Sequence, residues 1–251
     1  MSVLFDIADG VARVTINRVD RMNAVDAATE IRLEEIWSQI ETDETVRVVV
    51  LTGAGADMKS DVGKSGLEYW ASLNENGFGG IAMRQSLNVP VIARVNGLAL
   101  GGGMEMVLGC DIVIASDTAR FGLPEAKVGR LPLDGGMVML QRLIPEKIAA
   151  GLMLTGRMMS AADAAHYGLV NAVVAADDLD AEVERWVNDI TSCAPLSIRA
   201  IKQTIRQTAQ HSIHNARSLR LPELIRALES EDANEGVAAF RERRAPVWRG
   251  C

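Results

Sequence analysis

The chain has 251 residues, 48% of them apolar, which suffices to bury a sizeable core as one large domain or a core with an appendage. Its net charge of −7 argues against nucleic acid or an anionic membrane as the main partner. Its three cysteines share no metal-like spacing, and no signal-like N-terminus or run of about 18 apolar residues occurs, so we expect a cytoplasmic protein without a bound metal.

The first part of the chain alternates between strand-like and helical patterns. Two β-rich runs flank Asp9-Gly10, a two-residue hairpin signal, and a helical pattern follows. The residues between 67 and 82 include Tyr69, Trp70 and Phe78 among glycines and asparagines, which is typical either of a mobile lid over a pocket or of plain packing. The expected elements are strands at 3–7, 11–16, 46–52 and 89–95 and a helix at 26–40.

The central stretch, residues 95–136, holds two carboxylates that each follow a turn. Three glycines precede Met104 and Glu105 and predict a tight turn that opens a helix. The first N–H groups of a helix lack intrahelical partners, so they can hold a developing oxyanion beside a carboxylate that moves a proton. Glu125 follows Leu123-Pro124 and is either a second such carboxylate or an ordinary first-turn residue.

The rest of the chain is predicted to be mainly helical. Ser160 is expected to cap a short helix that ends at Tyr167-Gly168, and Cys193-Ala194-Pro195 is the best candidate boundary, giving regions 1–192 and 193–251. The expected elements are strands at 111–115 and 169–174 and helices at 136–143, 149–155, 179–190, 196–207, 219–229 and 232–243.

A glycine-bearing loop after the 46–52 strand offers two interpretations. Gly63-Lys64-Ser65 could belong to a phosphate-binding loop, but the first glycine of that pattern should stand at position 58, which is Met58. The alternative is the element Gly55-Ala56-Asp57-Met58-Lys59, whose meaning depends on the rest of the sequence.

That element completes a resemblance covering essentially the whole chain. The run V-N-G-x-A-x-G-G-G-x-E at 95–105, C-D-x-x-x-A at 110–115, and F-G-x-P-E at 121–125 with G-x-x-P and G-G after it resemble the crotonase superfamily of enoyl-CoA hydratases and isomerases. The resemblance implies an α/β fold: a ββα spiral core (1–192) carrying the active site, and a C-terminal helical oligomerisation region (193–251) in a homotrimer or dimer of trimers.

The resemblance also implies a site. Glu105 and Glu125 match the acid–base pair, and the N–H groups of Ala56 and Gly102 match the oxyanion hole. The loop before Ala56 is several residues shorter than in the family and lacks its Phe-Ser, so a shifted register would put Val62 in place of Ala56. The distance to Gly77-Phe78 favours Ala56. The residues expected to contact CoA are Ala56, Asp57, Met58, Lys59, Gly102 and, from a neighbouring subunit, Phe240 and Arg243.

With both glutamates present, the expected reaction is reversible syn addition of water to an α,β-unsaturated acyl-CoA, with CoA as part of the substrate and no further cofactor. A double-bond isomerase, an acyl-CoA hydrolase, or a silent acyl-CoA-binding member stays an alternative, the last because the shortened loop could misplace a donor. An anionic CoA ester would need a local basic pocket in this acidic protein.

Four further stretches narrow the resemblance: Gly77-Phe78, residues 123–127, Thr155-Gly156-Arg157 and the ending at 230–250. They resemble carnitinyl-CoA dehydratases, whose substrates would be carnitinyl-CoA and crotonobetainyl-CoA. A trimethylammonium group favours aromatic faces, and Tyr69, Trp70 and Phe78 are the candidates. Asp134 either touches a polar substrate group or only makes its turn. No catalytic role is assigned to the remaining candidates, which are His166, His211 and His214.

Overall fold

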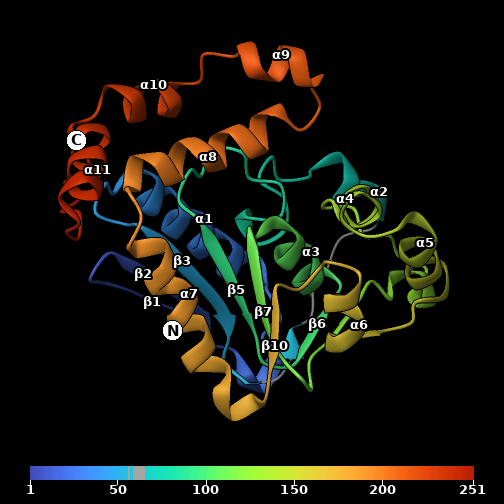
Figure 1. Ribbon diagram of the computed structural model, residues 1–251. Coiled ribbons are helices and arrows are strands. Elements are labelled where there is room, and N and C mark those ends of the chain that lie inside the picture. The colour runs from blue at the N-terminus through green and yellow to red at the C-terminus, as the bar shows by residue number, and fades with distance from the viewer. Residues whose placement is uncertain (56, 59–65) are drawn as a thin grey trace.

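The computed structural model describes residues 1–55, 57–58 and 66–251, and its strands form two sheets (Figure 1). The larger sheet has the order β1-β2-β3-β5-β7-β10; β1 and β2 are an antiparallel hairpin with Val3 opposite Ile16, and the other pairs are parallel. This confirms the predicted hairpin and strands. The bounds are β1 (Val3–Ala8), β2 (Val11–Ile16), β3 (Val48–Gly53), β5 (Val91–Val95), β7 (Ile112–Ser116) and β10 (Ala172–Val174).

Apolar residues on both faces hold the large sheet between helices. Along β3, Val48 and Val50 pack with α7 (Leu179–Thr191), whereas Val49 and Leu51 pack in the cluster of α1 (Ala27–Thr42). A strand buried on both sides reads as a continuous apolar run, which explains the Val-Val-Val-Leu sequence.

The smaller sheet consists of four short strands. It has the order β4-β6-β8-β9, with β4, β6 and β8 parallel and β9 antiparallel. The sequence pattern did not indicate β6, β8 or β9 because strands of two or three residues have no legible alternation. The bounds are β4 (Asp57–Met58), β6 (Leu98–Leu100), β8 (Arg120–Gly122) and β9 (Met159–Ser160).

The shorter helices lie in the connections between strands or directly after β10. The predicted cap is confirmed, since the Asp163 N–H donates to Ser160 Oγ at 3.1 Å at the start of α6. The segment 67–82 contains a short helix, α2, and the buried Phe78. The bounds are α2 (Gly66–Ala71), α3 (Gly102–Gly109), α4 (Gly136–Leu143), α5 (Glu146–Thr155), α6 (Ala161–His166) and the 3-10 helices η1 (Val19–Arg21), η2 (Phe78–Gly80), η3 (Glu125–Val128) and η4 (Ala176–Asp178).

Four C-terminal helices lie along one end of the molecule, at the top and left of Figure 1. The first is anchored to the core, because the buried Lys202 ammonium pairs with Asp111 at 2.7 Å and donates to the Val89 carbonyl at 2.6 Å. No helix in the described part of the chain is long and apolar enough to cross a membrane. The bounds are α8 (Pro195–Thr208), α9 (Ile213–Ser218), α10 (Pro222–Glu229) and α11 (Glu231–Glu242).

Candidate active site

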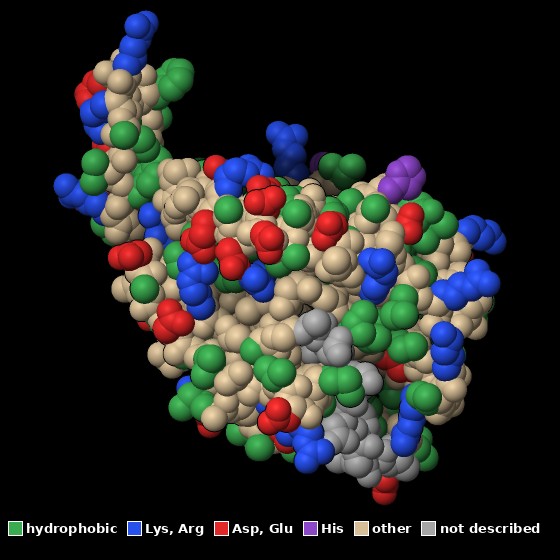
Figure 2. Space-filling view, turned by 90° about the horizontal axis from the view of Figure 1, so that it is seen from below, with side chains coloured by type: hydrophobic (Ala, Val, Ile, Leu, Met, Phe, Trp, Pro, Cys, Tyr) green, Lys and Arg blue, Asp and Glu red, His purple; other side chains and the backbone are tan. Residues whose placement is uncertain are grey.

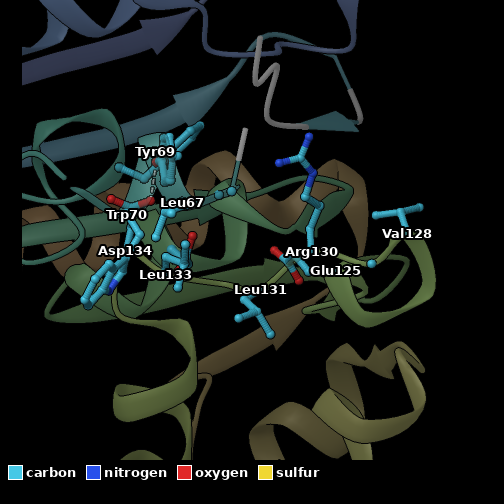
Figure 3. Close-up of a pocket in the computed structure, with 14 residues that line it drawn as sticks. Leu67, Tyr69, Trp70, Glu125, Val128, Arg130, Leu131, Leu133 and Asp134 are labelled. Carbon is cyan, nitrogen blue, oxygen red and sulfur yellow. Dashed lines mark hydrogen bonds between the residues drawn. The ribbon is translucent and has the colours of Figure 1, made fainter. Parts of the chain in front are cut away.

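A cavity of about 660 Å³ lies between α2, the start of α3, η3 and the loop before α4 (Figure 3). This volume lies within the range of roughly 300–1,000 Å³ common for small-molecule sites. Its lining is Gly66, Leu67, Tyr69, Trp70, Phe78, Gly102, Glu105, Glu125, Val128, Gly129, Arg130, Leu131, Leu133 and Asp134.

The N-terminus of α3 opens onto this cavity. Gly101 has φ 57° and ψ −128°, a conformation that a side chain disfavours, and it turns β6 into the helix. Gly102 is the first helical residue, so its N–H has no acceptor within the helix. A Cβ on Gly102 would lie 2.4 Å from Cε1 of Phe78, so the ring closes over a position that only glycine fits. The predicted glycine turn and helix are therefore confirmed.

Glu105 is the fourth residue of α3 and is buried, with only 4% of its surface exposed. Burial raises the pKa of its carboxyl to about 8, and the negative charges of Asp134 and Glu125 act in the same direction. The Gly136 N–H donates to Glu105 Oε1 at 2.9 Å, which fixes the carboxyl and partly offsets the rise. Glu105 is therefore mostly protonated at neutral pH.

Glu125 begins η3 and lines the same cavity. Burial also raises the pKa of this carboxyl. Its Oε2 is buried and has no hydrogen-bond partner in the described part of the protein. A buried carboxylate oxygen without a partner can accept a proton from a water or substrate that enters the cavity.

A second hydrogen-bonded pair joins two walls of the cavity. The Tyr69 hydroxyl on α2 donates to Asp134 Oδ2, in the loop before α4 (Figure 3). Burial raises the pKa of Asp134, and the bond from Tyr69 partly offsets this rise. Burial and the neighbouring Asp134 keep Tyr69 protonated by raising its pKa. Residues 134–136 thus contact α2 through Asp134 and Glu105 through Gly136.

Three carboxylates line the cavity, and most of its exposed lining side chains are apolar. Arg130 is the one basic side chain among the described lining residues, whereas three carboxylates line the cavity. Its exposed lining side chains include Arg130 and the apolar Leu67, Trp70, Val128 and Leu131. On the face shown in Figure 2, basic and acidic side chains are interspersed rather than gathered by sign. The expected basic pocket for CoA stays a prediction.

The structure brings Gly102, Glu105 and Glu125 together at one cavity, as the sequence pattern requires. Tyr69, Trp70 and Phe78 also line it, although Phe78 is only 5% exposed and belongs to the core. Sequence reasoning did not identify Arg130, Leu131 or Leu133 as lining residues. The glycine and proline turn around them, G-R-L-P-L, was the only signal that could have found them.

The other predicted contacts are separate from the cavity or outside the described residues. Ala56, Lys59 and the alternative donor Val62 lie outside the described residues, as does the rejected Gly63-Lys64-Ser65 motif. The backbone of β4 pairs with β6, upstream of Gly102. Phe240 and Arg243, at the end of α11, do not line the cavity of their own chain, and Phe240 is 86% exposed. The three histidines also do not line it.

Comparison with known proteins gives a consistent family match. Residues 6–251 match the model described as enoyl-CoA hydratase/isomerase. A relative from Proteus mirabilis (strain HI4320), named carnitinyl-CoA dehydratase, is 37% identical over 241 residues, 92% of each chain. The protein of that name from Escherichia coli (strain K12) is 36% identical, covering 96% of this chain and 95% of its own. The crystal structure of enoyl-CoA hydratase from Mycobacterium tuberculosis H37Rv aligns with a TM-score of 0.90 at 32% identity, covering 100% of this chain and 99% of that one.

Proposed function

Because the chain belongs to the enoyl-CoA hydratase/isomerase (crotonase) family, we propose that it adds water to the double bond of an α,β-unsaturated acyl-CoA, and removes water in reverse. The family fold expected from the sequence is confirmed by the same similarity. The observation that carries the proposal is the pair of glutamates, one buried and one half-buried, whose pKa values are raised and which line one cavity beside the N-terminus of α3.

In the proposed hydration, the thioester oxygen lies at the Gly102 N–H. Attack of water on the β-carbon moves electrons toward that oxygen, and an N–H placed there stabilises the enolate. A second donor would come from the 56–65 segment, with Ala56 or Val62 as its candidates. One glutamate takes a proton from water as the C–O bond forms, and the other gives a proton to the α-carbon.

The two glutamates are best treated as a coupled pair. Because Glu105 keeps its proton up to about pH 8, it is the preferred proton donor of the pair at neutral pH. In the hydration direction, Glu105 is then the proton donor, and Glu125 must be ionised to act as the acceptor. Dehydration uses the same two groups in the opposite protonation states.

The identity of the substrate's acyl group is a separate proposal from the type of reaction. Relatives named carnitinyl-CoA dehydratase support crotonobetainyl-CoA as a candidate substrate, and carnitinyl-CoA as its hydrated product. Isomerase or hydrolase activity, or acyl-CoA binding without turnover, stays the alternative. In a homotrimer or dimer of trimers, the exposed Phe240 and Arg243 would contact a neighbouring subunit's CoA.

The test is to add crotonyl-CoA and crotonobetainyl-CoA separately and follow the loss of the conjugated thioester absorbance. We expect hydration of at least one, with product confirmed by mass as substrate plus water. Release of free CoA would instead identify a hydrolase, and a shifted double bond without added mass an isomerase. Binding of both thioesters without any reaction would overturn the hydratase proposal.

We expect hydration to lose activity as pH rises through about 8, because Glu105 then loses the proton that it donates. Asp134→Asn removes a negative charge that raises the Glu105 pKa, so this alkaline limit should move to lower pH. The measurement is the pH dependence of kcat/KM for crotonyl-CoA in both proteins. An unchanged limit in the variant would mean that Asp134 is not electrostatically coupled to the proton donor.

A further inference from the structure

The cavity has two chemically different ends. Tyr69, Trp70 and Asp134 are grouped on one side of Figure 3, and Glu125, Val128 and Arg130 on the other. The hydratase chemistry uses Glu105 and Glu125, and it assigns no contact with the substrate to the Tyr69–Asp134 pair.

Asp134 is a buried acid that has no cationic partner among the described residues. It is only 5% exposed, and no lysine or arginine of the described chain forms an ion pair with it. Its side-chain partner is the Tyr69 hydroxyl, which can only donate while it keeps its proton. A buried carboxylate is costly unless it is paired, so this end of the cavity favours a ligand that brings positive charge.

The neighbouring rings add a second, independent preference. Tyr69, Trp70 and Phe78 all line the same cavity. Aromatic faces attract cations, and quaternary ammonium groups are commonly bound by such rings. A trimethylammonium group cannot donate a hydrogen bond, so charge and ring faces are the only means of recognising it.

We propose that Tyr69 and Asp134, with the ring of Trp70, form the subsite for a quaternary ammonium group at the end of the acyl chain. The proposal rests on the proposed function only in assuming an acyl-CoA ligand. Asp134 supplies the opposite charge, and the Tyr69 hydroxyl holds that carboxylate in place. The pair thereby makes a cationic acyl group the preferred one over a neutral group of the same shape.

The test uses saturated thioesters, which have no double bond to hydrate. The Kd of 4-(trimethylammonio)butyryl-CoA is measured by calorimetry beside that of 5,5-dimethylhexanoyl-CoA, in which carbon replaces the charged nitrogen. Wild-type protein should bind the cationic thioester more tightly. Asp134→Asn should weaken that ligand about tenfold, the effect of one partly screened charge, and leave the neutral one unchanged. Tyr69→Phe should give a smaller loss in the same direction.

The matched control is Asp6→Asn, which makes the same change in net charge at an exposed position of β1 outside the cavity. It should change neither Kd. Equal weakening of both ligands by Asp134→Asn, or a wild-type protein that does not distinguish them, would overturn the subsite. If Asp134→Asn does not fold, the subsite is tested by the two Kd values of the wild-type protein and by those of Tyr69→Phe. Selective binding without turnover of enoyl-CoA would sink the hydratase proposal and leave the subsite standing.

Discussion

Glu105→Gln is expected to lower kcat for hydration about a thousandfold, the usual contribution of a positioned acid–base group. Glutamine keeps the shape of the side chain and can still accept the Gly136 N–H through Oε1, but it cannot give up and regain a proton. KM should change little, because the carboxyl acts on the reacting atoms rather than on CoA. Glu125→Gln should cause a loss of similar size.

The same substitution should stabilise the folded protein at alkaline pH. Burial raises the Glu105 pKa from 4.5 to about 8, so between these values the folded protein holds a proton that the unfolded chain has lost. Stability at this site therefore falls as pH rises through that window. Glutamine does not ionise. We therefore expect the free energy of unfolding of Glu105→Gln to exceed that of the wild type by roughly 1–3 kcal/mol at pH 9, with no such gain at pH 5.

Urea unfolding at both pH values measures this difference. Glu229→Gln is the matched control, because Glu229 is exposed on α10 and should show no pH-dependent gain. A variant that loses activity yet shows the same stability difference from wild type at both pH values would contradict a protonated, buried Glu105. The loss of activity would then need another cause, such as a misplaced helix.

The sequence predicted the site residues whose signal is local. The glycine run and the apolar residues around Glu105 sufficed to predict a turn, a helix and a shielded carboxyl, and each is confirmed. By contrast, Tyr69 and Asp134 are 65 residues apart, and no local periodicity links them. Their hydrogen bond depends on how α2 and the loop before α4 meet, which is a property of tertiary packing.

Parts of the fold also depend on tertiary packing and could not be predicted from local sequence patterns. The strands of the large sheet and most helices follow from apolar periodicity and capping, as at Asp26, whose carboxylate accepts from the Thr29 N–H at 2.9 Å. The smaller sheet has strands of two or three residues that are stabilised by their partners rather than by their own sequence. Phe78 illustrates the ambiguity of aromatic residues, since the same pattern fits a lid and a ring buried against Gly102.

Gly102→Ala is expected to lower kcat about a hundredfold or more, the cost of displacing an oxyanion donor. The added methyl group would lie 2.4 Å from the Phe78 ring, so either the ring or the start of α3 must move. Overpacking of this kind also destabilises a core, by roughly 1–3 kcal/mol. Kinetics with crotonyl-CoA and thermal unfolding measure the two effects separately. The control is Gly151→Ala on α5, where a Cβ meets nothing within 4 Å and both quantities should be retained.

A double variant tests whether the contact between the new methyl group and the Phe78 ring causes the losses expected for Gly102→Ala. Phe78→Leu removes the ring atoms that the new methyl group would meet, so Gly102→Ala with Phe78→Leu should regain stability relative to Gly102→Ala alone. If kcat returns as well, displacement of the α3 N-terminus caused the loss, and the Gly102 N–H acts through its position. A single Gly102→Ala variant with wild-type kcat would contradict the expected displacement of the helix end, because the Phe78 ring would then have moved while the Gly102 N–H stayed in place.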